Sequence, residues 1–368
     1  MGRVRFEIDF VRIGMVRLRK RGEELRQFIL EKVETNPREF VALTIQKYNI
    51  TRQAVHKHIR ILIKQGALIR VKNGQYELHP QEEWNTTIAI SDKTSEDVIW
   101  RNEIASRIGQ LPDNALGIWH YGFTEMFNNV IDHSESKTVF VGIKKTAYST
   151  ELFISDFGIG IFNKIRHAMS LLDERHAVLE LTKGKLTTDP TRHSGEGIFF
   201  TSRMFDKFSI LSGGVFLSHN YGNDEDWILE NQENQNGTWI SMKLKNNTSR
   251  TTKEIFDKFT SGDNFGFTKT VVPVRLAQYG NEKLVSRSQA KRLLERIDRF
   301  KIVLFDFNEV ESIGQAFADE VFRVFAKQHP HIEIIPINAN DTVMQMVQRA
   351  WSHDEPEAPS PTEPSTTS

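Results

Sequence analysis

The sequence predicts a multidomain α+β protein, and three observations favour this fold class. The chain has 368 residues, of which 39% are hydrophobic, and this suits two or three domains with separate hydrophobic cores. Hydrophobic residues recur at helical spacing near the N-terminus, whereas strand-like and helix-like runs alternate near the C-terminus. Three short motifs rich in glycine and acidic residues lie between these regions. We therefore expect a helical unit, a central α/β unit and a small C-terminal α/β unit.

Composition narrows the class of protein. The chain has no cysteine, so it has neither a disulfide framework nor a thiolate metal site. It contains no apolar run of the length of a membrane helix and no signal-peptide core, and we therefore expect a cytoplasmic protein with no membrane partner. The net charge is zero, but residues 1–80 hold 17 Lys and Arg against 8 Asp and Glu. That local excess predicts an anionic partner for the N-terminal region.

The first 80 residues are expected to form three helices and a hairpin. Helical spacing predicts helices over Glu23 to Glu34, Phe40 to Tyr48 and Arg52 to Gln65, the last capped by Thr51. Asn73-Gly74 between two short strand-like runs predicts a tight hairpin. Three helices followed by a hairpin make a winged helix-turn-helix, and this segment resembles winged-helix transcriptional regulators.

The third of these helices is expected to read DNA. Its apolar residues Val55, Ile59, Leu62 and Ile63 are predicted to face the core. The opposite face carries side chains of the types that contact phosphates and base edges in a major groove: Arg52, Gln53, His56, Lys57 and Arg60. Double-stranded DNA is the partner that this face predicts. A winged helix that docks on a protein is the alternative.

A linker is expected over residues 81–100, because this stretch is acidic on balance and mixes turn-forming residues with scattered apolar ones such as Trp84 and Ile88.

Three motifs follow the expected linker. In Glu125 to His133, apolar residues recur at helical spacing, so Glu125 and Asn129 share one polar face. Asp156 to Gly160 (DFGIG) ends a strand-like run, and Gly195 to Ile198 (GEGI) opens a helical one. A helix N-terminus offers free amides to phosphate.

Jointly these motifs, in residues 101–248, resemble the GHKL ATPase superfamily, most closely its anti-sigma serine kinases. The resemblance implies an α/β sandwich that binds ATP and Mg²⁺. By matching position, Glu125 resembles the general base, Asn129 the magnesium ligand and Asp156 the acceptor of the adenine amine. The polar stretch 184–194 resembles a segment that covers the phosphates, although His193 stands where histidine kinases have a further glycine. The remaining residues that the resemblance assigns to the nucleotide are Asp132, Gly158, Gly160, Lys183, Arg192, Gly195, Gly197 and Thr238.

The last domain is expected over residues 265–352, where strand-like and helix-like runs alternate. It resembles the STAS-like domain of unknown function that follows GHKL domains in some bacterial proteins. In STAS domains that are phosphorylated, the acceptor serine precedes a glycine, but Ile313 holds that position here and Ser312 is adjacent. Charged residues in this region are interpreted mainly as surface pairs and helix caps: Arg287, Asp306, Glu311, Asp319, Glu320 and Arg323. The tail, residues 353–368, is expected to be disordered.

The combination predicts an ATP-binding bacterial regulator in which a nucleotide switch is coupled to DNA binding. Two alternatives stay open. One is a protein serine kinase acting on a STAS-type partner, and the other is a non-catalytic scaffold that is stabilised by nucleotide. A protein partner for the STAS-like domain and a homodimer are compatible with the sequence, and catalytic turnover is left undecided.

Overall fold

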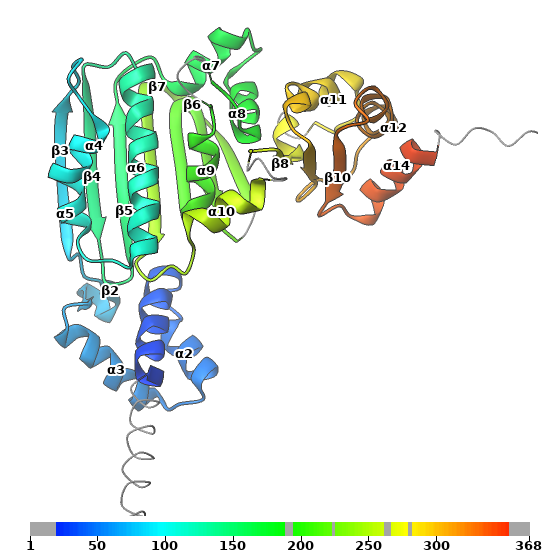
Figure 1. Ribbon diagram of the computed structural model, residues 1–368. Coiled ribbons are helices and arrows are strands. Elements are labelled where there is room, and N and C mark those ends of the chain that lie inside the picture. Colours follow the sequence, from blue (N-terminus) through cyan, green and yellow to red (C-terminus); the bar gives the residue numbers. More distant parts are fainter. Residues whose placement is uncertain (1–19, 188–193, 223–224, 261–265, 279–281, 353–368) are drawn as a thin grey trace, which may run out of the picture.

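The computed structural model describes residues 20–187, 194–222, 225–260, 266–278 and 282–352. These residues form a mixed α/β protein with a two-stranded, a five-stranded and a three-stranded sheet (Figure 1). The predicted multidomain α+β class is therefore confirmed at this coarse level. Within the described ranges, no helix has the length and apolar character needed to cross a membrane. Arg192, His193 and the tail lie outside the described residues.

The N-terminal unit has the predicted order of elements. A helix over residues 20–35 precedes α2 (Phe40–Tyr48) and α3 (Arg52–Lys64). β1 (Leu68–Arg70) and β2 (Tyr76–Leu78) then pair antiparallel across a 3₁₀ turn, η1 (Lys72–Gly74). The hydroxyl of Thr51 accepts a hydrogen bond from the Ala54 amide at 3.3 Å, which confirms the predicted cap of α3.

The prediction that Ile63 of α3 faces the core is wrong. Val55, Ile59 and Leu62 are buried, but Ile63 is 38% exposed. Val55, Ile59 and Leu62 are four and three residues apart, so they follow one stripe of α3, and Ile63 lies a further 100° around the helix. The apolar stripe of α3 is therefore narrower than the sequence suggested.

The central unit is built on a five-stranded antiparallel sheet in the order β3-β4-β5-β7-β6. The strands are β3 (Glu82–Ala89), β4 (Thr138–Lys145), β5 (Ser149–Asp156), β6 (Lys207–Asn220) and β7 (Glu225–Lys245). The expected linker over 81–100 needs correction, because residues 82–89 form an edge strand that pairs with β4 along its whole length. Trp84, Thr86 and Ile88 alternate with more exposed residues, and this period of two is a strand signal.

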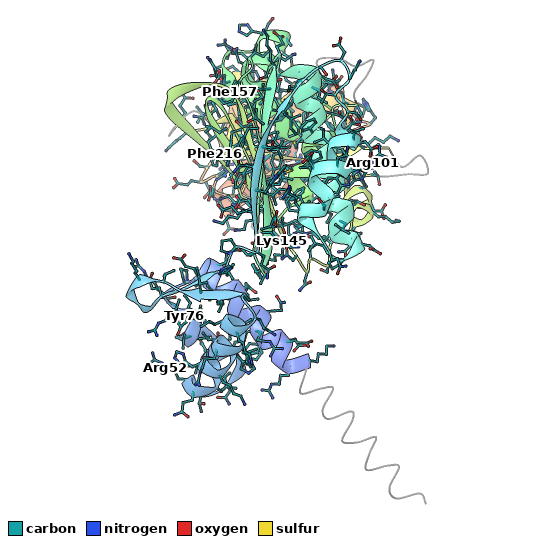
Figure 2. The ribbon with its side chains drawn as sticks, turned by 90° about the vertical axis from the view of Figure 1, so that its left-hand side faces the viewer. Arg52, Tyr76, Arg101, Lys145, Phe157 and Phe216 are labelled. Carbon is teal, nitrogen blue, oxygen red and sulfur yellow. The ribbon has the colours of Figure 1, made fainter. Side chains whose placement is uncertain are left out.

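Helices cover one face of that sheet (Figures 1 and 2). α6 (Asp113–His133) and α9 (Gly197–Met204) pack together, and α10 (Thr252–Phe259) lies beside them. The short helices α4 (Glu96–Ile99), η2 (Trp100–Ile104) and α5 (Ala105–Ile108) follow β3. The core of this layer is aromatic, and Trp119, Phe123 and Phe127 of α6 are completely buried. α7 (Ile161–Met169) and α8 (Glu174–Lys183) follow β5 and lead towards the C-terminal unit.

The C-terminal unit has a three-stranded parallel sheet in the order β10-β9-β8. Its elements confirm the predicted alternation of strands and helices. They are β8 (Lys269–Pro273), η3 (Val274–Ala277), α11 (Arg287–Leu294), η4 (Ile297–Arg299), β9 (Ile302–Asp306), α12 (Gln315–Asp319), η5 (Glu320–Phe325), α13 (Ala326–Gln328), β10 (Glu333–Ile337) and α14 (Asp341–Ser352). One continuous hydrophobic core runs from the central unit into this one.

Candidate functional site

A cavity of about 240 Å³ lies in the central unit where α6, β5, α7, α8, α9 and β7 converge. Five stretches of sequence that are far apart in the chain contribute to its wall. Six of the residues singled out by the sequence line it together: Glu125, Asn129, Asp156, Gly195, Gly197 and Thr238. This convergence makes the cavity the candidate functional site.

Glu125 and Asn129 form one side of the cavity. They are one helical turn apart on α6, whose residues Phe123, Met126 and Phe127 are fully buried in the core. A Cβ atom added at Gly197 would lie 2.0 Å from Glu125 Oε2, so only glycine allows the carboxylate to approach the first residue of α9. The positive end of the α9 dipole and this carboxylate are thus neighbours.

This side of the cavity is acidic. Burial raises the pKa of Tyr121, and the negative charges of Glu125 and Glu196 raise it further. Burial also raises the pKa of Glu196, although Lys185 opposes that shift. The amide oxygen of Asn129 is a hard oxygen ligand of the kind that Mg²⁺ prefers.

Asp156 forms the opposite, buried side. It is the last residue of β5 and is only 3% exposed. The Gly158 amide donates to Asp156 Oδ1 at 2.8 Å. Burial raises the pKa of Asp156, while hydrogen bonds from the backbone amides of Gly158 and Thr238 lower it. A buried carboxylate with acceptor capacity to spare is suited to a ligand that brings its own N–H donors.

The glycines after Asp156 allow the chain to turn tightly beside it. A Cβ atom at Gly158 would lie 1.8 Å from the carbonyl oxygen of Ser134, so no other residue fits there. Gly160 has a φ of +78°, which favours glycine. The Thr238 hydroxyl accepts a hydrogen bond from the Ile161 amide at 3.0 Å and so holds the start of α7 against the cavity. Gly158 and Gly160 therefore shape the wall of the cavity but do not themselves line it.

Sequence reasoning missed several lining residues at the Asp156 side. Lys164 on α7 lines the cavity, and its Nζ donates to the carbonyl oxygen of His133 at 2.8 Å. His133 and Ser134, at the end of α6, line it as well. The only sequence signal for Lys164 is its spacing three residues after Ile161, on one face of a short helix. That signal becomes informative only once α7 is known to cover the cavity.

Lys183 and Asp132 were also predicted to bind nucleotide, and they do not line the cavity either. The Lys183 side chain is 1% exposed, and its Nζ donates to the Glu180 carboxylate and to the carbonyl oxygens of Arg292 and Glu295. Leu181 is the residue of α8 that lines the cavity. Lys183 lies on the opposite face of the helix, and its side chain therefore points into the C-terminal unit. Asp132 is exposed on the outer side of α6.

A second candidate site is the outer face of α3. Arg52, Gln53, Lys57 and Arg60 are exposed there, and His56 is half-buried. Figure 2 shows Arg52 on the side of the N-terminal unit that points away from the sheet. The exposed Arg70 and Lys72 extend this basic surface into the hairpin. The surface is accessible and positively charged, as a phosphate-binding face has to be.

Of the charged residues that the sequence singled out in the C-terminal unit, Asp306, Asp319 and Arg323 make contacts within that unit. Arg323 donates two hydrogen bonds to Asp319, at 3.1 and 2.8 Å. Asp306 Oδ1 accepts from the Asn308 amide at 2.9 Å and from Asn338 Nδ2 at 3.0 Å. Ile313 is buried and bridges to Leu284. Glu311 and Arg287 are exposed.

A family model matches part of the C-terminal unit. Residues 289–344 match the family model of the STAS-like domain of unknown function. The predicted STAS-like character of the C-terminal unit is therefore confirmed over this range. No curated protein matches the chain.

Proposed function

We propose that this protein is an ATP-responsive regulator, with a nucleotide site of the GHKL type in the central cavity and a DNA-binding winged helix at its N-terminus. One observation carries the nucleotide assignment. Glu125, Asn129, Asp156, Gly195, Gly197 and Thr238 come from separate stretches of sequence and line a single cavity. The order and the residue types of these stretches are those on which the resemblance to GHKL ATPases rests.

The chemistry of the cavity supports one orientation for the proposed nucleotide. Asp156 is buried and can accept a hydrogen bond from the exocyclic amine of adenine, while Ile161 and Ile165 offer apolar contact to the ring. The phosphates would extend towards Gly195 and Gly197, where the amides at the start of α9 point. A volume of about 240 Å³ lies just below the usual range for small-molecule sites of roughly 300–1,000 Å³. The base and its sugar therefore account for most of the enclosed part.

Asn129 would hold Mg²⁺, with its amide oxygen as the ligand. When bound, Mg²⁺ supplies positive charge that offsets the phosphates. Glu125, one turn away on the same face of α6, would orient and accept a proton from a water molecule or an attacking hydroxyl. Its position against Gly197 keeps the carboxylate beside the end of the helix to which the phosphates are directed.

Calorimetry with MgATP on the full chain tests the nucleotide assignment. Asp156→Asn should weaken binding by at least about 1.5 kcal/mol, because it replaces a charged acceptor by an amide that also presents donors. Asp132→Asn makes the same chemical change at an exposed position on α6 and should leave the affinity unchanged. A folded wild-type protein that binds no ATP, or an unchanged affinity in Asp156→Asn, would remove the cavity from consideration.

Turnover separates the regulator from its alternatives. Glu125→Ala should still bind MgATP but lose hydrolysis or transfer by a factor of roughly 10² to 10⁴, as general bases usually contribute. Asn129→Ala should instead lose the part of the affinity that depends on magnesium. Radiolabelled phosphate appearing on a STAS-type protein or on Ser312 would establish the serine kinase, whereas tight binding without any turnover would establish a binding device alone.

DNA binding is proposed for the outer face of α3, on the strength of its exposed basic residues. The N-terminal helices bury their apolar faces in a core that also includes Tyr148 of the central unit, and Arg52, Lys57 and Arg60 lie on the exposed face of α3. Phosphate contacts by such residues give affinity, and Gln53 or His56 could add contacts to base edges.

A further inference from the structure

α8 is a wall that the central cavity shares with the C-terminal unit. One side of the helix and the residues that follow it line the cavity through Leu181, Leu186 and Thr187. The other side carries His176, Glu180 and Lys183, all buried. Figure 1 shows α8 on the side of the central unit that faces α11. Any shift of α8 therefore changes both surfaces at once.

Charged side chains, most of them buried, connect the C-terminal unit to α8. Lys183 Nζ donates to the carbonyl oxygens of Arg292 and Glu295, at 3.2 and 2.9 Å, at the C-terminal end of α11, where the helix dipole favours a cation. Arg296 Nη1 contacts Glu180 Oε2 at 2.9 Å. His176 Nε2 lies 2.8 Å from Glu295 Oε2. Ligand atoms of His176, Glu180 and Glu295 come within 4.8 Å of one another, but Glu180 is already paired with both Lys183 and Arg296, so a further buried cation is disfavoured.

The C-terminal unit also donates hydrogen bonds to the backbone of Lys183 and Lys185, just before the cavity residues Leu186 and Thr187. Thr270 Oγ1 donates to the carbonyl oxygen of Lys183 at 2.7 Å. Arg296 Nη2 and Arg299 Nη1 donate to the carbonyl oxygen of Lys185, at 2.5 and 3.1 Å. Leu186, the next residue, lines the cavity, and its amide donates to the carbonyl oxygen of Gly195 at 3.1 Å. An unbroken chain of contacts thus leads from η4 to the cavity.

Arg296 is held in an unfavourable backbone conformation at this joint. Its φ is +59°, which is uncommon for a residue other than glycine, asparagine or aspartate. Its side chain makes contacts to both Glu180 and Lys185, and these contacts offset the backbone strain only while the C-terminal unit is docked on α8. Release of the C-terminal unit would therefore leave this strain without compensation.

We propose that α8 couples occupancy of the cavity to docking of the STAS-like unit, so that a nucleotide in the cavity and the docked C-terminal unit stabilise each other. This inference rests on the proposed nucleotide site. Because coupling between two binding equilibria is reciprocal, whatever releases the C-terminal unit weakens nucleotide binding, and nucleotide in turn strengthens the joint. Lys183 and Arg296 act as positioning residues, since neither lines the cavity.

Hydrogen exchange of the full chain, with and without a non-hydrolysable ATP analogue and Mg²⁺, tests the coupling. In the wild type, the analogue should slow exchange of amides in residues 292–299, which do not line the cavity, by about tenfold. Arg296→Asn keeps a residue that tolerates positive φ and removes both guanidinium contacts. It should abolish that protection and weaken analogue binding by about tenfold.

Two further variants keep the result interpretable. Thr270→Val removes a single hydrogen bond to Lys183 with almost no change in shape, and should reduce the protection at 292–299 and the affinity by a few-fold if Arg296→Asn does not fold. Arg323→Asn, which breaks contacts to Asp319 inside the same unit, should change neither. Wild-type binding without altered exchange at 292–299, or unchanged affinity in Arg296→Asn and Thr270→Val, overturns the coupling alone. Absence of analogue binding to the wild type overturns the nucleotide site as well.

Discussion

The central unit is joined to its neighbours in two different ways. At the N-terminal joint, Glu34 Oε1 accepts from Ser149 Oγ at 2.7 Å and from Lys243 Nζ at 2.8 Å, and the carboxyl and ammonium side chains are 21% and 28% exposed. At the C-terminal joint, Glu180 and Lys183 are 0% and 1% exposed. Partly exposed ion pairs contribute little to stability, whereas removing one partner of a buried pair is strongly destabilising.

The two joints also differ in their distance from the cavity. The C-terminal joint includes α8, which is part of the cavity wall. The N-terminal joint contacts the first residue of β5, Ser149, while Asp156 at the other end of the strand lines the cavity. Eight residues of strand span roughly 25 Å. An effect of nucleotide on the N-terminal unit has to travel the length of the sheet, whereas its effect on the C-terminal unit is direct.

The largest expected effect is on stability at the C-terminal joint. Lys183→Met keeps a long apolar side chain but leaves Glu180 buried with one cation fewer. We expect a loss of about 3–5 kcal/mol, measured by equilibrium urea unfolding of the full chain with tryptophan fluorescence as the signal. A loss below about 1 kcal/mol would mean that the ion pairs at the two joints contribute similarly to the free energy of unfolding.

DNA binding should depend on the basic face of α3 in the N-terminal unit. Replacing Arg52, Lys57 and Arg60 by Ala in the full chain should reduce the slope of log affinity against log salt by nearly three units, about 0.9 for each phosphate contact. Replacing the exposed Lys93, Lys253 and Lys258 removes the same charge elsewhere and should have little effect on the slope. If the wild type binds no duplex even at low salt, the unit docks on a protein and the serine kinase becomes the leading hypothesis.

Because the N-terminal joint is far from the cavity, we expect nucleotide to have only a small effect on DNA affinity. Saturating MgATP should change duplex affinity by less than about fivefold, the lower end of ordinary coupling, while it changes exchange at residues 292–299 by more. Fluorescence anisotropy of a labelled duplex, titrated with and without MgATP, measures the first quantity. A coupling of a hundredfold to DNA would show that the sheet transmits strain better than α8 does.

Acidic pH should weaken nucleotide binding at the cavity. Burial raises the pKa of Asp156 in the folded protein, so protonation favours folding at low pH, and this contribution is lost as pH rises through the folded pKa. Binding of the adenine amine needs the carboxylate. MgATP affinity in the wild type should therefore fall by up to roughly tenfold per pH unit below that pKa, starting at a higher pH than an ordinary aspartate would give. Titration of Asp156→Asn by calorimetry should lack this component.

The smallest expected effect is at the N-terminal joint itself. Glu34→Gln retains an acceptor for Ser149 but loses the ion pair to Lys243. We expect a loss of less than about 1 kcal/mol and unchanged MgATP affinity, measured as for Lys183→Met. A loss above 2 kcal/mol would contradict the distinction between the joints.

Local patterns predicted much of the fold and a third of the cavity lining, six residues of eighteen. Helical spacing placed Glu125 and Asn129 on one face of α6, and the glycines marked the turn after Asp156, because these features depend on neighbouring residues. The edge strand β3 was predicted as a linker because its partner β4 is about 50 residues away. Lys183 was assigned to phosphate because it borders the polar stretch 184–194, which resembles a segment that covers the phosphates. Only the docking of α11, more than 100 residues later, buries it.

Tyr148 bears on how the chain is made. It lies in the turn between β4 and β5, yet it is 7% exposed and belongs to the core of the N-terminal unit. During synthesis at roughly 5–20 residues per second, residue 148 follows residue 78 by about 4 to 14 seconds. The three helices and the hairpin are therefore complete on the ribosome well before their core is. A fragment that ends at residue 80 would lack Tyr148, and its core would stay incomplete. The DNA-binding surface therefore has to be studied in a chain that extends beyond the β4–β5 turn.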